Sequence, residues 1–171
     1  IVQRFHREGA QIAIAARRID VVNAAASAVG GKGYQCDITN NDEVAALIQN
    51  VEKDFGRIDI AVNCAGYEQS TPIAELTPEK LVAMQAVQFT GAIYCMQHFG
   101  NSMAASGGGA FLSISSQTAH SPAIGLAAYG SSKAGVEYAT KIAAVEYGPK
   151  GVRFNCVAAG LIETPMTARV F

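Results

Sequence analysis

Short apolar runs alternate with helix-like stretches along almost the whole chain, and this alternation is the strongest constraint on its fold. Asn40 and Glu43 have capping-box spacing, and apolar residues then recur at helical intervals from Val44 to Phe55. Five apolar runs have the length of strands, and they cover residues 11–16, 32–36, 57–63, 110–114 and 152–157. Because the crossovers between parallel strands place helices on the sheet, we predict a parallel sheet covered on both faces, with a buried first strand.

Further helices are predicted from their start and stop signals. Thr77 is a suitable N-cap with Pro78 at the first helical position, and Gly9 and Gly148 are suitable stops. We therefore expect helices at residues 1–8, 20–29, 78–103 and 125–147.

Two glycine-rich segments, 30–33 and 107–109, have the composition of phosphate-binding loops. Each follows a predicted helix and precedes a predicted strand. A phosphate loop has the opposite order, because the anion lies at the N-terminus of a helix. We therefore expect turns at both segments.

Size and charge exclude several classes of protein. The 171 residues are half hydrophobic and 16% charged, which is typical of one globular domain over residues 1–171. A net charge of −1 and the lack of a basic run argue against a nucleic-acid partner. The chain has neither an apolar stretch of membrane-spanning length nor a signal-peptide pattern, so we expect a soluble, cytoplasmic protein with no membrane partner.

The sequence does not indicate a metal site. The cysteines are scattered without a Cys-x-x-Cys pair and lie in apolar segments, so we expect small core side chains rather than zinc ligands or disulfides. They are Cys36, Cys64, Cys95 and Cys156. His6, His98 and His120 also lack metal-ligand spacing, and we expect structural roles for them.

Ser116, Tyr129 and Lys133 form the candidate catalytic cluster. Tyr129 and Lys133 are four residues apart on a predicted helix, so their side chains share one face. The reference pKa of a phenol is about 10, and a neighbouring ammonium lowers it, which suits Tyr129 to general acid-base chemistry. Ser116 ends a predicted strand, where open α/β sheets place ligands. The same spacing also occurs by chance on helices, so the trio alone leaves a purely structural role open.

Four short motifs in a fixed order connect this cluster to a known family. They are Asn63-Cys64-Ala65-Gly66, Ile114-Ser115-Ser116, Tyr129-x-x-x-Lys133, and Ala159-Gly160 followed by Thr164-Pro165-Met166. Together they resemble the short-chain dehydrogenase/reductase family along nearly the whole chain. The resemblance implies a Rossmann-type, doubly wound parallel sheet in three α/β/α layers. It also implies a nicotinamide cofactor and reversible hydride transfer to a small carbonyl compound or from a secondary alcohol.

The resemblance further implies a role for each site residue. Tyr129 would donate the proton to the substrate oxygen, Ser116 would hydrogen-bond that oxygen, and Lys133 would lower the pKa of Tyr129 and bind the nicotinamide ribose. Gln88 occupies the position of an Asn that, in the family, holds a proton-relaying water. Further cofactor contacts fall on Asp37, Ile38, Asn63, Ala65, Gly66, Gly160, Ile162 and Thr164.

The end of the first predicted strand indicates the cofactor. Dinucleotide folds use an acidic residue there for NAD, whereas an Arg nearby accommodates the 2′-phosphate of NADP. Ala16 stands at this position and is followed by Arg17 and Arg18. We therefore predict NADP(H), with Arg17 as the phosphate ligand; the alternative is that both arginines belong to a solvated strand end.

Three departures from the family pattern matter. The chain lacks the family's first strand with its Gly-rich turn and its last helix and strand, so we expect the sequence to be incomplete. Without that first strand, both neighbouring strands would have unpaired backbone groups. Gln88 replaces the family's Asn, and Ala159 replaces a Pro, which restores a backbone N–H and frees φ at that turn.

Alternatives remain for the function and the partners. Besides a ketone reductase or alcohol dehydrogenase, for example one that resembles the 3-oxoacyl reductases, the residues allow a non-catalytic sensor or scaffold, or an epimerase or dehydratase. Tyr67, Gln69 and His120 are candidate substrate contacts. Met84, Met96 and Met103 are candidate core or subunit-contact residues, and the resemblance implies a homodimer or homotetramer.

Overall fold

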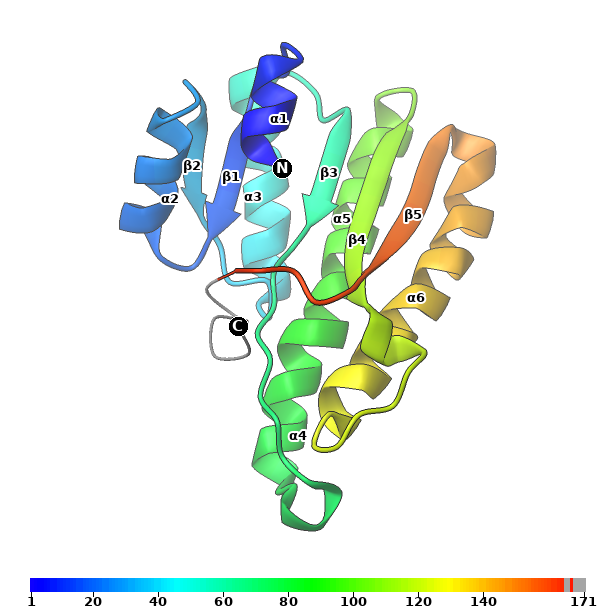
Figure 1. The fold of residues 1–171 in the computed structure, drawn as a ribbon. Coiled ribbons are helices and arrows are strands. Elements are labelled where there is room, and N and C mark those ends of the chain that lie inside the picture. The colour runs from blue at the N-terminus through cyan, green and yellow to red at the C-terminus, as the bar shows by residue number, and fades with distance from the viewer. Residues whose placement is uncertain (165–166, 168–171) are drawn as a thin grey trace.

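All strands of the described chain, residues 1–164 and 167, run parallel, but they form two separate sheets (Figure 1). In this computed structural model, β1 (Ala13–Ala16) pairs with β2 (Lys32–Gln35). The second sheet has the order β3-β4-β5, formed by Ile60–Asn63, Gly109–Ser116 and Val152–Ala159. The predicted strands are therefore confirmed in number and direction.

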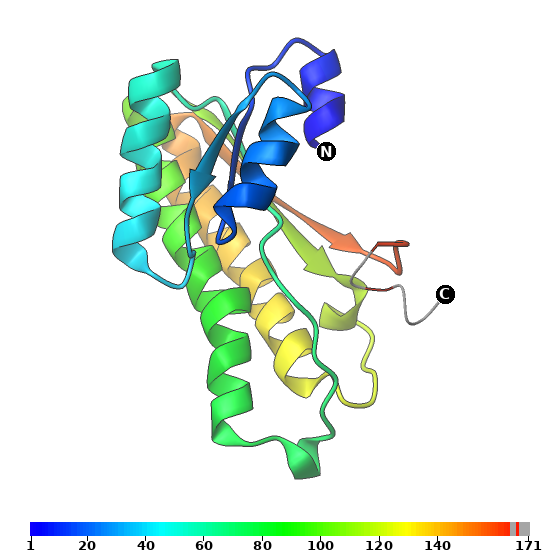
Figure 2. The same ribbon diagram turned by 90° about the vertical axis from the view of Figure 1, so that its left-hand side faces the viewer.

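The helices lie in two layers, one on each side of the strands. Their bounds are α1 Val2–Arg7, α2 Ile19–Ser27, α3 Asn41–Phe55, α4 Pro78–Gln85, α5 Gly91–Ala105 and α6 Ala127–Tyr147. A π-helical turn, Ala86–Thr90, joins α4 to α5. Figure 2 shows α3, α5 and α6 on one side of the strands and α1 and α2 on the other. This is the predicted three-layer α/β/α arrangement.

Local signals in the sequence explain how these helices begin. The Asn40 side chain accepts hydrogen bonds from the backbone N–H groups of Asp42 and Glu43, at 3.0 and 3.4 Å. Thr77 caps α4 in the same way, through the N–H of Lys80. Such caps satisfy N–H groups that have no partner inside the helix, so both predicted starts are confirmed.

In the glycine-rich segment 107–109, Gly107 and Gly108 form a turn between α5 and β4, as predicted, whereas Gly109 already begins β4. Gly107 and Gly108 have φ values of 90° and 118°, which only glycine adopts readily. A Cβ atom on Gly108 would also lie 2.5 Å from the carbonyl oxygen of Gly151, so the close approach of the two turns requires glycine.

The core lies between the second sheet and the α3, α5 and α6 layer. Phe111 on β4 is 1% exposed, and its ring centroid lies 5.9 Å from that of Phe99 and 5.2 Å from that of Phe154. The predicted core methionines, Met84, Met96 and Met103, are all buried. Burial of these side chains supplies the main driving force for the arrangement.

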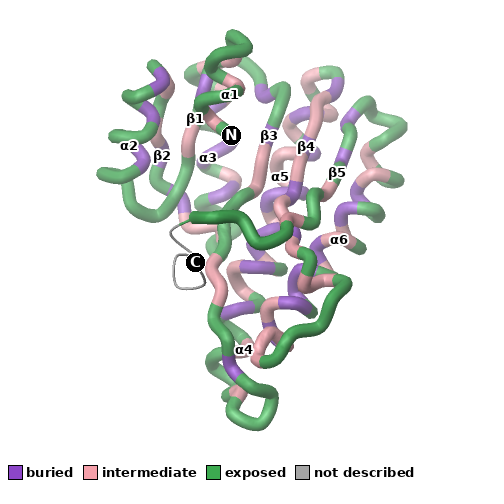
Figure 3. Tube along the Cα trace, in the orientation of Figure 1, coloured by how far each residue is buried: buried purple, intermediate pink, exposed green. Residues whose placement is uncertain are grey.

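The first strand is more exposed than predicted. Ala13, Ala15 and Ala16 are exposed, and Ile60 on β3 is 51% exposed (Figure 3). The reason is that β1 pairs with β2 alone and β3 pairs with β4 alone, so these two strands do not bond to each other. The prediction of a buried strand at residues 11–16 is wrong for its exposed positions, whereas Ile12 just before it is buried.

Among residues 1–164 and 167, no helix combines the length and apolarity needed to cross a membrane. Within the same residues, no group of three or more His, Cys, Asp or Glu side chains is placed to hold a metal ion. Cys36 and Cys95 are buried as expected and Cys156 is half-buried, but Cys64 is exposed, because it follows the last residue of β3.

Candidate functional site

The candidate site lies at the C-terminal ends of the strands, where β4 and the first turns of α6 come together. Ser116 is the last residue of β4, and Tyr129 and Lys133 lie in the first two turns of α6. A parallel sheet brings the C-terminal ends of all its strands to one edge, which is why residues far apart in the sequence can meet there.

Tyr129 and Lys133 share one face of α6, as their spacing predicts. The Lys133 ammonium nitrogen lies 5.6 Å from the centroid of the Tyr129 ring. Lys133 is only 7% exposed, and its Nζ donates a 2.8 Å hydrogen bond to the carbonyl oxygen of Ile114 on β4. Burial lowers the pKa of Lys133, although the cysteines Cys156 and Cys64 oppose that effect.

Ser116 is oriented by the turn that follows it. Its Oγ accepts hydrogen bonds from the backbone N–H and the hydroxyl of Thr118, at 3.2 and 3.0 Å. A hydroxyl has two acceptor positions and one proton, so the proton of Ser116 remains free to donate. Ser116 hydrogen-bonds Tyr129 and stabilises the phenolate, which lowers the pKa of Tyr129.

The net pKa of Tyr129 nevertheless lies above its ordinary value. Burial of the phenol is the largest cause, Ser116 opposes it, and the charge of Glu68 adds to the increase. Desolvation of the phenol thus dominates this pKa, while the ammonium of Lys133 donates to the carbonyl oxygen of Ile114. The lowering of this pKa by Lys133 stays a prediction.

Gln88 lies in the π-helical turn and is 2% exposed. Its side-chain NH₂ donates a hydrogen bond to the carbonyl of Tyr67, in the loop after β3. Its Oε1 is buried and has no hydrogen-bond partner within the described part of the chain. π-helical turns are frequent at functional sites, and here the amide holds the loop after β3 against the helix.

The loop after β3 leaves small residues exposed at the strand end. Asn63 Oδ1 accepts a 3.1 Å hydrogen bond from the N–H of Ala65, and Cys64, Ala65 and Gly66 are exposed. Exposed small residues at the C-terminal end of a parallel strand are suited to close approach of a ligand to the backbone. This loop therefore fits a dinucleotide.

A second group of predicted cofactor residues follows β1 and β2. Asp37 Oδ1 accepts hydrogen bonds from the N–H and hydroxyl of Thr39, at 2.9 and 2.8 Å. The bond from the Thr39 N–H is the main cause of the lowered pKa of Asp37, and the positive charge of Arg17 also lowers it. The Arg17 side chain is thus close enough to Asp37 to act on its charge, and it is exposed at the end of β1.

The remaining predicted cofactor residues differ in accessibility. Ile38 is half-buried, and its side chain packs against α5 at Gly91, so it has a core role besides any ligand contact. Gly160, Ile162 and Thr164 are exposed after β5. Pro165 and Met166, from the same motif, lie outside the described residues.

His120 is engaged by a neighbouring side chain, and its role as a substrate contact stays a prediction. Its Nε2 lies 2.8 Å from Oε2 of Glu137, and the other oxygen of that carboxylate accepts a 2.8 Å hydrogen bond from the Ser115 hydroxyl. Sequence reasoning missed Glu137, and it placed Ser115 in the motif with Ser116 without a role of its own. The spacing of Glu137, four residues after Lys133 and eight after Tyr129, is the signal that could have found it.

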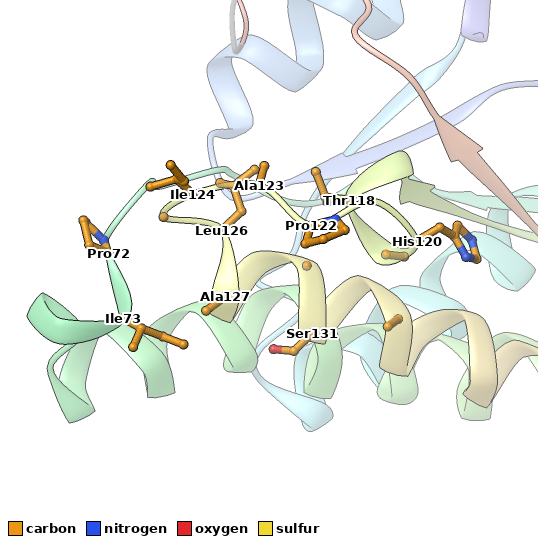
Figure 4. Close-up of a pocket in the computed structure, with 14 residues that line it drawn as sticks. Pro72, Ile73, Thr118, His120, Pro122, Ala123, Ile124, Leu126, Ala127 and Ser131 are labelled. Carbon is orange, nitrogen blue, oxygen red and sulfur yellow. The ribbon is translucent and has the colours of Figure 1, made fainter.

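A cavity of about 530 Å³ lies beside the site, on the outer side of α6. Pro122, Ala123 and Ile124 of the loop before α6 line one side, and Ala127 and Ser131 line the helix side (Figure 4). Its lining includes none of Ser116, Tyr129 and Lys133. The cavity therefore borders the candidate cluster without including it, since Thr118 and Gly130 in its lining are neighbours of Ser116 and Tyr129.

Comparisons with known proteins agree with this geometry. A family model described as enoyl-(acyl carrier protein) reductase matches residues 1–171. The chain is 32% identical, over 97% of its length, to a protein of Mycolicibacterium smegmatis named D-threitol dehydrogenase. It spans 66% of that protein, so the chain covers just under two thirds of the length of this relative.

Solved structures are similar as well. One is described as a putative short-chain dehydrogenase/reductase from Burkholderia xenovorans, with 29% identity and a TM-score of 0.92; the match covers all of this chain and 70% of that one. Another is described as ribose-5-phosphate isomerase from Brucella melitensis 16M, with 35% identity and a TM-score of 0.93, covering 98% of this chain and 65% of that one.

The contact between Gly66 and Gln88 leads to a prediction. A Cβ atom on Gly66 would lie 2.8 Å from Oε1 and 2.9 Å from Nε2 of Gln88, and the buried, hydrogen-bonded amide cannot move aside cheaply. Gly66→Ala should therefore destabilise the protein by about 1–3 kcal/mol, the usual cost of overpacking, measured by denaturant unfolding. Gln88→Ala in the Gly66→Ala background should recover part of this loss, and no recovery would contradict the steric explanation.

Proposed function

Because the chain belongs to the short-chain dehydrogenase/reductase family, we propose that it acts as an NADP(H)-dependent oxidoreductase on a small carbonyl compound or secondary alcohol. The observation that carries the proposal is the placement of Ser116 at the end of β4 beside Tyr129 and Lys133 in the first turns of α6, with the Lys133 ammonium 5.6 Å from the centroid of the phenol ring. A non-catalytic scaffold has no need of this arrangement of a half-buried phenol and a buried ammonium.

When bound, the nicotinamide supplies or accepts the hydride. In the reduction direction, Tyr129 donates its proton to the substrate oxygen, and its raised pKa keeps that proton in place at neutral pH. Ser116 turns its single proton, which Thr118 leaves uncommitted, from Tyr129 to the same oxygen and so fixes its position. Lys133 uses one of its three donors on Ile114 and has two left for the ribose hydroxyls.

Arg17 favours NADP(H) over NAD(H). Its guanidinium is exposed at the end of β1, where Ala16 supplies no carboxylate to the ribose hydroxyls. A guanidinium binds phosphate through charge-assisted, bidentate hydrogen bonds. Further cofactor contacts are proposed at or after the C-terminal ends of β2, β3 and β5. They are Asp37, Asn63, Ala65, Gly66, Gly160, Ile162 and Thr164.

The substrate class is a ketone or secondary alcohol, and related proteins support it. One relative, 35% identical over 133 residues, is named cis-4-hydroxycyclohexanecarboxylate dehydrogenase, and another, 30% identical over 158 residues, is named carbonyl reductase family member 4. An epimerase or isomerase of the same fold is the second candidate, because one similar structure is described as an isomerase. Incubating the protein and NADPH with ketones, β-ketoacyl thioesters and sugars separates the two, because an isomerase converts substrate without net oxidation of NADPH.

The protein is also proposed to form a homodimer or homotetramer through α6 and the α4–α5 helix. Apolar side chains on these helices are exposed: Val82 is 64% exposed, Tyr138 67% and Val145 77%. Exposed apolar patches of this kind mark contact surfaces between proteins. Sedimentation equilibrium of the purified protein tests this assembly.

Removing the Tyr129 hydroxyl should abolish most of the activity. Tyr129→Phe should lower kcat by about a hundredfold to ten-thousandfold, the usual contribution of a positioned acid or base, with cofactor affinity nearly unchanged. NADPH oxidation and a fluorescence titration of cofactor binding measure the two effects. Tyr138→Phe, an exposed tyrosine on the same helix, is the matched control and should retain activity.

The raised pKa of Tyr129 predicts opposite pH profiles for the two directions. Reduction needs the phenol, which persists at neutral pH and above, so its kcat should stay level through that range. Oxidation needs the phenolate, so its kcat should rise about tenfold per pH unit until the pH reaches the pKa of Tyr129. An oxidation rate independent of pH between neutral and alkaline buffers would argue against Tyr129 as the base.

Arg17→Ala should change cofactor preference. Loss of a charge-assisted contact of about 1.5–3 kcal/mol lowers kcat/KM for NADPH by about tenfold or more and leaves that for NADH nearly unchanged. Steady-state kinetics with both cofactors gives the ratio, and the neighbouring Arg18→Ala is the control. An unchanged ratio in Arg17→Ala would contradict the assignment.

A further inference from the structure

We propose that Glu137 is a positioning residue of the active site, because its carboxylate ties both sides of the Ser116 segment to the helix that carries Tyr129 and Lys133. The inference rests on the proposed function of that site. Glu137 lies on α6, one turn after Lys133, and its side chain is only 13% exposed.

Each oxygen of the Glu137 carboxylate contacts a different residue. Its Oε1 accepts a 2.8 Å hydrogen bond from the hydroxyl of Ser115, which is 3% exposed. Its Oε2 lies 2.8 Å from Nε2 of His120, whose side chain is 63% exposed. Both contacts are within the usual hydrogen-bond range, and a carboxylate is the side chain with two acceptor oxygens for such a bridge.

Ser115 and His120, the two partners of Glu137, lie on either side of Ser116 in the sequence. Ser115 precedes Ser116 directly, and His120 ends the 3-10 turn Gln117–Ala119 that Ser116 caps. Ser116 therefore lies in a short segment that is attached to α6 on both sides. The carbonyl oxygen of Lys133, 3.4 Å from the Ser115 hydroxyl, is a second and weaker acceptor for the same proton on the same helix.

The position of Ser116 acts directly on the catalytic phenol. Its hydrogen bond to Tyr129 stabilises the phenolate, and this is the effect that opposes the burial of Tyr129. A hydrogen bond weakens steeply when its geometry deteriorates. If the segment moves away from α6, Tyr129 loses this bond and its pKa rises further.

The groups around Glu137 are compatible with a carboxylate held in one position. His120 faces it from the end of the 3-10 turn, the Cys156 thiol faces it from β5, and Lys141 of its own helix lines a shallow cavity together with it. Burial is the main cause of the raised pKa of Cys156, and the negative charge of Glu137 adds to it, which favours the neutral thiol. Lys133 on the preceding turn is bound to Ile114.

The test compares three substitutions in the purified protein. Glu137→Leu removes both contacts while keeping the size of the side chain. Glu137→Gln keeps a side chain that can bridge Ser115 and a neutral His120. Glu146→Leu is the control, because it alters an exposed carboxylate on the same helix. A misplaced reacting group costs up to about a hundredfold in rate, so Glu137→Leu should lower kcat about ten- to a hundredfold. Glu137→Gln should stay within about threefold of the parent, and Glu146→Leu should match it.

A titration of Tyr129 distinguishes positioning from general destabilisation. The pKa of Tyr129, taken from phenolate absorbance with Tyr129→Phe as the blank, should rise in Glu137→Leu and in Ser116→Ala. It should rise no further when the two changes are combined, since both remove the same hydrogen bond. An unchanged pKa in Glu137→Leu, or additive shifts in the double variant, would overturn the inference.

Two further outcomes keep the result interpretable. If Glu137→Leu does not fold, Ser115→Ala takes its place, because it removes one side of the bridge. Ser115→Ala should raise the pKa of Tyr129. An unchanged pKa in this variant would overturn the inference. If the parent protein oxidises no NADPH with any substrate but the pKa of Tyr129 shifts as expected, the proposed function fails while the positioning role of Glu137 stands.

Discussion

The packing of β4 against α6 is the interaction on which the site depends. β4 is paired on both edges, with β3 and β5, and every second side chain faces the helices. These inward side chains change from apolar to polar along the strand, from Phe111 to Ser113 and Ser115, and all three are buried. The same strand thus carries core residues at one end and the candidate site at the other.

Buried hydroxyl groups on such a strand need partners, and α6 supplies them. The hydroxyl of Thr140 lies 3.4 Å from that of Ser113, and the carboxylate of Glu137 accepts a hydrogen bond from the Ser115 hydroxyl. In the opposite direction, Lys133 donates to the carbonyl of Ile114. Because an unpaired buried polar group costs about 1–3 kcal/mol, these bonds fix the strand and the helix relative to each other.

Much of the fold follows from local patterns, and the failures have physical causes. Helix caps such as Asn40 were predictable because cap and helix are adjacent in sequence. The exposure of β1 was not, because it depends on which strands pair across the structure. Cys64 was expected in the core on the strength of its apolar neighbours, but the strand ends one residue before it.

The sequence by itself determined the alternation of strands and helices, the face shared by Tyr129 and Lys133, and the position of Ser116 at a strand end. Side chains repeat every two residues in a strand and every 3.6 residues in a helix, so these features can be inferred from the order of residues alone. Only the tertiary structure decided that burial raises the pKa of Tyr129, that Lys133 bonds to Ile114, and that Glu137 bridges Ser115 and His120. Desolvation and contacts between distant segments depend on the distances between folded elements, and no local pattern encodes those distances.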